Sequence, residues 1–236
     1  MQLFYDPDAN EGYHQLSDAE SKHLIRVLRK REGEVIHLTD GKGHLYQSTI
    51  LEAGKRVVLN CQLEEKKQPN HTPIHMIVCP TKSADRIEWF IEKAVELGVT
   101  SITPLISSNS ERRKVKIERW QKVAISAMKQ SLKFNLPIIH DPIDIWDLLA
   151  ESESWEGRKL LFHCRNSKKS NFKEVLEKDD EMHFLIGPEG DFTADEVSVA
   201  TDMGWISTTL GDRRLRTETA AISALDGFHW FQNWMT

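Results

Sequence analysis

Hydrophobic and polar positions follow two different patterns along the chain. Up to residue 68, short apolar–polar alternations surround a single helix-like segment, which predicts a small β-rich unit. From residue 74 onward, apolar runs of strand length alternate with amphipathic stretches of helix length, which predicts an α/β domain with a mostly parallel sheet. The polar stretch 64–73 contains two prolines and is interpreted as a linker. We therefore expect two domains, 1–68 and 74–236.

The first unit is predicted to combine one helix with several strands. Ser17 followed by Glu20 is a capping-box pattern, which opens a helix through about Lys30. Asp40-Gly41 between two strand-like stretches is a strong hairpin signal. The expected strands are 2–5, 34–39, 44–51 and 55–63. Such a unit fits a small RNA-binding barrel.

The second unit is predicted from its alternating elements. The expected strands are 74–79, 99–106, 159–163, 184–186 and 206–210. The expected helices are 85–97, 117–129, 144–150 and a long helix that begins near Thr217 or Thr219. Gly98 should close the first of these helices as a C-terminal cap.

Two stretches near the end of the chain each read as a strand, a tight turn and a helix start. In the first, the apolar run 184–186 stops at Gly187, and Thr193 with Glu196 forms a capping box. As glycines, Gly187 and Gly190 can take positive φ and can let another molecule approach the backbone. In the second, Gly211 interrupts a strand before the long helix. Loops at the carboxyl ends of strands bind ligands in open α/β sheets, so the pair favours a ligand site over two ordinary turns.

Composition narrows the class of protein. Hydrophobic residues make up 39% of the chain and charged residues 28%, which is typical of a soluble globular protein. No apolar run is long enough to cross a bilayer, and no signal peptide is expected. Cys61, Cys79 and Cys164 show no paired spacing and indicate reduced thiols in a cytoplasmic protein. The scattered histidines predict no metal site. The net charge of −5 disfavours a protein that coats RNA, but it allows a local basic face.

Two stretches near the end of the chain closely resemble the SPOUT methyltransferases. The first is Gly187-Pro188-Glu189-Gly190-Asp191-Phe192, and the second, residues 210–220, reads Leu-Gly-Asp-Arg-Arg-Leu-Arg-Thr-Glu-Thr-Ala. Within them they resemble the RsmE-type enzymes, which methylate N3 of a uridine in small-subunit (16S) ribosomal RNA. Asp191 stands where that family usually has a second glycine, and Arg214 where an apolar residue is commoner. The likeness continues at 82–86, 93–99, 118–120 and 130–131, so it covers nearly the whole chain.

The resemblance implies a fold, a cofactor and partners. The fold would be a PUA-like β-barrel followed by a SPOUT domain with a C-terminal trefoil knot. The cofactor would be S-adenosyl-L-methionine, and the partners 16S ribosomal RNA and a second copy of the chain. Trp230, Phe231 and Trp234 would supply the apolar surface of the homodimer. Some of these aromatic residues could instead cover the core of the monomer.

The expected site residues fall into three groups. The cofactor ligands would be Leu105, Ile186, Gly187, Pro188, Glu189, Gly190, Leu210, Gly211, Leu215, Arg216, Thr217, Thr219 and Ala220. The RNA contacts would be Lys22, Arg26, Arg29, Lys82, Arg112, Arg113 and Lys133. The first three share one side of the predicted helix by their spacing. A solvated face is the usual interpretation of such a basic run.

The catalytic residues are expected to be Arg216, Glu189 and Glu218. The N3–H of uridine is a weak acid, so a carboxylate could accept the proton and Arg216 could stabilise the charge left on the uracil carbonyls. Glu218 is equally well explained as a helix-start carboxylate favoured by the helix dipole.

Other functions stay open. The runner-up is a SPOUT methyltransferase acting on another RNA atom, such as a ribose 2′-hydroxyl. A non-catalytic RNA-binding protein is an alternative from a different class. A phosphate-binding enzyme is disfavoured because no Gly-Lys-Ser/Thr accompanies the glycines.

Overall fold

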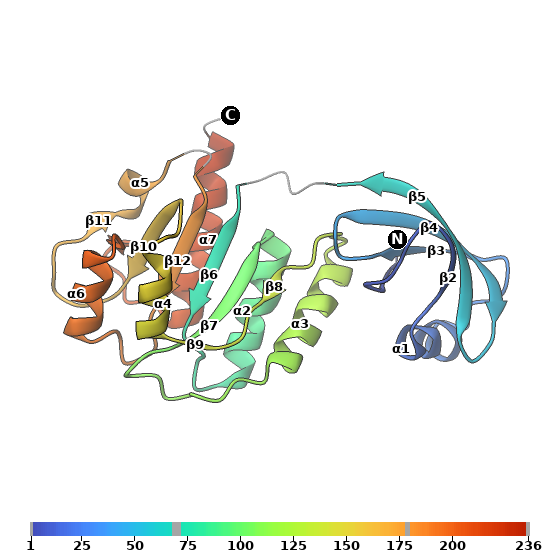
Figure 1. Cartoon of the computed structure of the whole chain (residues 1–236), viewed down its shortest axis with the longest axis horizontal. Coiled ribbons are helices and arrows are strands. Elements are labelled where there is room, and N and C mark those ends of the chain that lie inside the picture. Colours follow the sequence, from blue (N-terminus) through green and yellow to red (C-terminus); the bar gives the residue numbers. More distant parts are fainter. Residues whose placement is uncertain (1, 68–71, 178–179, 235–236) are drawn as a thin grey trace. The chain divides into compact units, whose positions relative to one another are not determined.

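The computed structural model describes residues 2–67, 72–177 and 180–234. Contacts divide the chain into two compact units (Figure 1). One contains the described residues up to 67 together with Ile125–Leu136, and the other contains the rest. The predicted linker 64–73 begins inside a strand, and its residues 68–71 lie outside the described part of the chain.

The first unit contains a sheet that, among the described residues, has five strands in the order β1-β3-β4-β5-β2. Their bounds are β1 Leu3–Tyr5, β2 Gly12–Gln15, β3 Val35–Thr39, β4 His44–Ala53 and β5 Val57–Lys66. The predicted hairpin is confirmed, because β3 and β4 pair antiparallel around Asp40-Gly41. The short strand β2 was not expected from the sequence. Phe4, Leu38 and Leu59 lie in the buried core of this unit.

The helix of the first unit differs from its prediction. Ser17 caps helix α1 (Asp18–Lys22), since its side chain accepts a hydrogen bond from the Glu20 N–H. The continuous helix through Lys30 is wrong, because the chain widens into a π-helix, η1 (His23–Val27). In this wider turn Leu24 is buried, and Ile25 and Leu28 pack against the same core. Core packing therefore overrides the regular helical spacing assumed for the basic residues.

A segment from the second half of the chain completes the first unit. Phe134 forms a buried cluster with Leu3 and Leu45. The Thr39 hydroxyl donates to the Phe134 carbonyl at 3.3 Å, and Lys129 forms an ion pair with Glu20. The segment 125–136 is therefore part of this unit by packing, hydrogen bonding and charge.

The second unit is an α/β structure with a parallel sheet, as the alternating pattern predicts. The described strands run in the order β11-β13-β10-β12-β6-β7-β8, with β9 paired to β7. Every strand pair recorded in this sheet is parallel. The bounds are β6 Ile74–Val78, β7 Ser101–Ile106, β8 Ile138–Ile139, β9 Ile143–Asp144, β10 Arg158–Phe162, β11 Ser170–Asn171, β12 Met182–Ile186 and β13 Ile206–Thr209.

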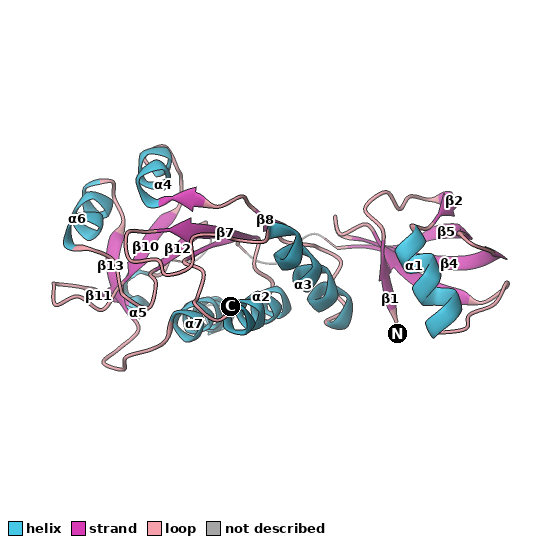
Figure 2. Cartoon of the chain, turned by 90° about the horizontal axis from the view of Figure 1, so that it is seen from below, coloured by secondary structure: helices cyan, strands magenta, loops and turns pink. Residues whose placement is uncertain are grey.

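Helices cover both faces of this sheet. Their bounds are α2 Ala84–Leu97, α3 Ile117–Gln130, α4 Ile145–Ser152, α5 Phe172–Val175, α6 Ala194–Asp202 and α7 Thr217–Trp234. Figure 2 shows α4 and α6 on one side and α2 and α7 on the other. Phe184 of β12 packs edge-on against Phe228 of α7, whereas Leu185 lies in a cluster with Leu148 of α4. Successive residues of the central strand are thus buried on opposite faces.

Local signals read from the sequence hold at two helix ends. Gly98 caps α2 in the left-handed region, with φ of 87°. Thr193 and Glu196 form the predicted capping box at α6, with hydrogen bonds in both directions. No helix in the described part of the chain has the length and apolarity needed to cross a membrane. The trefoil knot stays a prediction.

Candidate active site

The loops that follow the carboxyl ends of β6, β7, β12 and β13 meet at one edge of the parallel sheet. This edge is where open α/β sheets bind ligands. The loop after β12 carries Gly187–Asp191, and the loop after β13 leads through Gly211 into α7. Both stretches singled out in the sequence therefore end at the same edge of the second unit.

The first glycine loop is held by close packing instead of unusual glycine conformations. Gly187 and Gly190 do not use the positive φ that glycine allows, because neither residue lies in the left-handed region. A Cβ on Gly187 would stand 2.9 Å from the Phe192 ring, and one on Gly190 would stand 3.1 Å from Asn109 Cβ. The left-handed residue is Asp191, with φ of 61°.

Asp191 is held in place by its own carboxylate and by a neighbouring loop. Its Oδ2 accepts the Cys164 N–H at 3.0 Å, and its Oδ1 accepts the Phe192 N–H at 2.9 Å. The Asn109 side-chain amide donates to the carbonyls of Gly190 (3.3 Å) and Asp191 (2.8 Å). Asparagine and aspartate tolerate the left-handed region better than most residues, which explains why Asp191 can replace a glycine here. Asn109 was missed in the sequence because nothing around it marks its role.

Glu189 connects the glycine loop to the loop after β6. One carboxylate oxygen accepts the Lys82 N–H at 3.0 Å, and the other is buried without a hydrogen-bond partner. The main chain of the two loops is also joined directly, since the Cys79 N–H donates to the Ile186 carbonyl at 3.1 Å. Burial raises the pKa of the Cys79 thiol to about 12, so this cysteine is no nucleophile.

The start of α7 connects the two glycine loops. The Thr217 hydroxyl donates to the Gly187 carbonyl at 2.9 Å, across thirty residues of sequence. Glu218 is buried at the same helix start, with one carboxylate oxygen 3.8 Å from Arg86 Nε and the other without a partner. Gly211 has φ of 110°, which favours glycine at this turn. Thr217 and Glu218 therefore belong to the site, together with Arg86.

The remaining expected cofactor ligands lie in or beside the same loops and differ in how much of each is exposed to solvent. Leu105 and Ile186 are buried strand-end residues, and Pro188 is buried beside Gly187. Leu210, Leu215 and Ala220 are half-buried. Arg216 and Thr219 are exposed at the start of α7. The two unpartnered oxygens of Glu189 and Glu218 can accept hydrogen bonds, and Arg216 offers an exposed positive charge.

The basic residues expected to contact RNA fall in both units. In the second unit, Arg112 donates to the Lys82 carbonyl at 2.7 Å, and Arg113 donates to the carbonyls of Ser107 and Ser108. The Lys82 ammonium lies 2.9 Å from Glu111. These residues therefore also stabilise the loops next to the glycine loop after β12.

In the first unit, Lys22, Arg26 and Arg29 are exposed on or after the helical segment. Arg29 takes φ of 56°, a left-handed conformation at the end of the π-helix. Lys133 is half-buried, and burial lowers its pKa. Of these four residues, Lys22 and Arg26 retain the exposed helical placement that the sequence indicated.

Known proteins share this arrangement. A family model for an RNA methyltransferase domain matches residues 68–228, and one for an RNA methyltransferase PUA domain matches residues 16–59. The fold and its glycine loops are thus those of an RNA methyltransferase. Ribosomal RNA small subunit methyltransferase E of Rickettsia conorii is 30% identical over 221 residues, covering 92% of this chain and 88% of that protein. The chain therefore belongs to the ribosomal RNA small subunit methyltransferase E family.

Solved structures agree with this assignment. A probable rRNA-methyltransferase from Porphyromonas gingivalis has a TM-score of 0.90 and 34% identity, with both chains fully covered. Ribosomal RNA small subunit methyltransferase E from Neisseria gonorrhoeae, solved bound to S-adenosyl methionine, has a TM-score of 0.86 and 31% identity, with 98% of each chain covered. The likeness extends over both units.

The left-handed conformation of Asp191 can be separated from its hydrogen bonds by two substitutions. Asp191→Gly and Asp191→Ala both remove the carboxylate, but only alanine keeps the cost of the left-handed region. We expect Asp191→Ala to lower the free energy of unfolding by about 1 kcal/mol more than Asp191→Gly. Urea unfolding of both variants measures this difference. Equal values would contradict the strain assigned to Asp191.

Proposed function

We propose that the protein transfers a methyl group from S-adenosyl-L-methionine to N3 of a uridine in 16S ribosomal RNA. The observation that carries the proposal is the joining of two glycine loops at the sheet edge by Thr217 and Gly187, in a chain of this family. The relative from Neisseria gonorrhoeae, which has the same fold, binds S-adenosyl methionine. Residues 74–236 would form the catalytic domain, with the predicted knot, and residues 1–68 the RNA-binding domain.

The residues at the loops fit this cofactor. Adenine and the methionine ammonium group are hydrogen-bond donors, and Glu189 and Glu218 each present a buried carboxylate oxygen without a partner. The close contacts around Gly187 and Gly190 leave no room for side chains at these positions. Backbone groups of 186–190 and 210–215 would hold the cofactor. Leu105 and the residues Thr217, Thr219 and Ala220 at the start of α7 would also contact it. When bound, the cofactor supplies an electrophilic methyl group.

The chain's own residues would orient the uracil and manage its charge. Holding N3 in line with the methyl donor could contribute ~7 kcal/mol or more by the effective-molarity argument. Arg216, exposed where the second loop meets α7, would stabilise negative charge on the uracil carbonyls. One of the two, Glu218 or Glu189, would accept the N3 proton through its unpartnered oxygen, and the other would bind the cofactor. Glu189 would also keep the loop after β6 in place through the Lys82 N–H.

The acceptor atom can be identified in the product. Small-subunit particles or 16S RNA are methylated with the purified chain and digested to nucleosides for mass spectrometry. We expect 3-methyluridine. A 2′-O-methylated nucleoside would instead support the alternative of ribose methylation, and no methylation would favour a non-catalytic RNA-binding protein.

Arg216→Ala separates chemistry from cofactor binding. Because Arg216 is assigned to the transition state, we expect turnover to fall by ~10²–10³ while cofactor affinity changes little. Methyl incorporation measures turnover, and calorimetry measures affinity. The matched control is Arg214→Ala, which removes another exposed arginine of the same loop; its turnover and cofactor affinity should both be close to those of the wild type. If Arg216→Ala loses affinity and activity in equal proportion, Arg216 is a cofactor ligand and the catalytic assignment fails.

The exposed basic residues of the first unit would bind RNA phosphates. We expect Arg26→Glu and Arg29→Glu to weaken binding to 16S RNA and to reduce the salt dependence by about one unit of slope for each phosphate that is no longer neutralised. Filter binding at several salt concentrations measures both. Lys55→Glu, an equal charge change at another exposed position of this unit, should have a smaller effect. If RNA affinity at low salt is unchanged, these residues do not contact RNA and form an ordinary solvent-exposed surface.

A homodimer is proposed from exposed aromatic residues on the helices of one sheet face. Trp230 of α7 is 60% exposed and Trp89 of α2 is 45% exposed. Such side chains are enriched at protein interfaces. The side chain of Trp234 lies outside the described residues. Sedimentation at micromolar concentration is expected to give twice the chain mass of 27.2 kDa, and a clean 27.2 kDa species would contradict the dimer. An enzyme of ribosomal RNA works where ribosomes are, so the proposal includes a cytoplasmic location.

A further inference from the structure

A row of polar side chains crosses the parallel sheet on the face that carries α4. The strand registers place Lys159 beside His183, His183 beside His75, and His75 beside Ser101. The next row toward the carboxyl ends is Leu161, Leu185, Ile77 and Thr103. Parallel sheets are covered on both faces, and their strands are ordinarily apolar. A row of polar residues near the amino ends of four strands therefore requires its own explanation.

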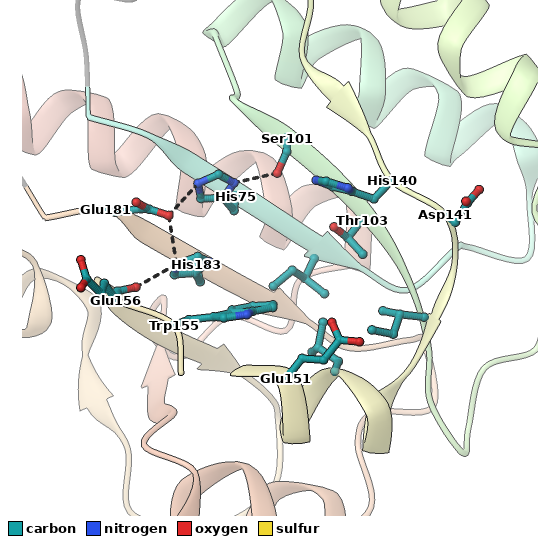
Figure 3. A pocket seen from close by; sticks show the side chains of 13 residues that line it. His75, Ser101, Thr103, His140, Asp141, Glu151, Trp155, Glu156, Glu181 and His183 are labelled. Carbon is teal, nitrogen blue, oxygen red and sulfur yellow. Dashed lines mark hydrogen bonds and ion pairs between the residues drawn. The ribbon is translucent and has the colours of Figure 1, made fainter. Parts of the chain in front are cut away.

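A cavity of about 620 Å³ opens over this row (Figure 3). Its described lining residues are His75, Ile77, Ser101, Thr103, His140, Asp141, Ile143, Leu148, Glu151, Trp155, Glu156, Glu181 and His183. The volume is within the range of small-molecule sites. The lining comes from β6, β7, the start of β12, α4 and the segments on either side of α4, and none of the described lining residues belongs to the glycine loops. The cavity is therefore separate from the proposed active site.

The histidines in the floor of the cavity are held as neutral rings. His75 Nε2 lies 3.0 Å from Glu181 Oε1, and His75 Nδ1 lies 2.7 Å from the Ser101 hydroxyl. His183 stacks between His75 and Trp155, with ring centroids 4.9 and 5.0 Å away. Its Nε2 donates to the Glu156 carbonyl, because that oxygen can only accept. Burial lowers the pKa of both histidines, that of His183 to about 4, which disfavours a positive charge on either ring.

Acidic side chains supply most of the charge around the cavity. Asp141, Glu151, Glu156 and Glu181 contribute four carboxylates, and none of the described lining residues is lysine or arginine. Lys159 is next to His183 in the row, but its ammonium group donates to the carbonyls of Ser152 and Met203. An anionic ligand would therefore be repelled, and a cation would be attracted.

We propose that this cavity binds a small aliphatic polyamine, whose ammonium groups pair with the carboxylates while its methylene segments lie on Ile77, Ile143 and Leu148. Several separated carboxylates beside apolar side chains match a ligand in which positive charges alternate with short hydrocarbon segments. The indole of Trp155 also lines the cavity and adds to its apolar surface. The proposal does not depend on the methyltransferase activity.

Calorimetric titration of the full chain with spermidine at low salt tests this. Glu151→Gln and Glu181→Gln should each weaken spermidine binding by about threefold to fivefold, as expected for loss of a partly exposed ion pair. Glu153→Gln is the matched control, because Glu153 is exposed near Glu151 but does not line the cavity. The affinity of Glu153→Gln for spermidine should be close to that of the wild type. S-adenosylmethionine affinity should be unchanged in all three variants, which shows that their second unit is folded.

A spectroscopic readout locates the ligand. Spermidine is expected to shift the ring signals of His75 and His183 in nuclear magnetic resonance spectra of the wild-type chain. The proposal is overturned if spermidine does not bind, if Glu153→Gln weakens binding as much as Glu151→Gln, or if both histidine signals stay unmoved.

Discussion

The second unit depends on the burial of β12 on both faces and its pairing along both edges. Every residue of this strand is buried, including His183. Its partners β10 and β6 fix the strand in register, so its carboxyl end delivers Gly187 to the middle of the sheet edge. From there Thr217 can reach the Gly187 carbonyl, and Glu189 can reach the loop after β6. A shift of one residue in β12 would exchange its two faces and separate these contacts.

The same strand carries two different environments at its two ends. At the carboxyl end, glycine backbone, the carboxylates of Glu189 and Glu218 and the exposed Arg216 surround the loops, which suits a ligand held against main chain. At the amino end, imidazoles and carboxylates surround a cavity with apolar walls. The two ends of this parallel sheet thus differ in their chemistry, since an exposed arginine lies at one end and no described lining residue of the cavity is lysine or arginine.

The sequence predicts the architecture well wherever a residue type determines the local conformation. Gly98, the Thr193–Glu196 pair and Asp40-Gly41 each mark an end or a turn that the structure contains. The π-helix at His23–Val27 could not be predicted, because it results from packing of Leu24 and Leu28 against a distant core. The very short strands β8, β9 and β11 carry too few residues to show a period.

Site prediction from sequence has the same limit. The glycine loops stand out because their residue types are unusual, and the resemblance supplies roles for them. Asn109 and Cys164 contact Asp191 from loops far away in sequence, so nothing near them marks the contact. The reason for glycine at 187 and 190 is likewise hidden in the sequence, since neither residue takes positive φ. Their small size is needed for the Phe192 ring and Asn109, which only the folded chain brings next to them.

Completion of the first unit by the segment around Phe134 has a consequence for synthesis on the ribosome. Leu3 and Leu45 leave the exit tunnel long before Phe134, which covers them in the folded unit. The ion pair between Glu20 and Lys129 and the hydrogen bond from Thr39 to the Phe134 carbonyl likewise form only after the later residues have been synthesised. The nascent chain therefore exposes part of this unit's apolar surface while the first strands and helix of the other unit are being translated. The first half of the protein can finish folding only after more than half of the chain has been made.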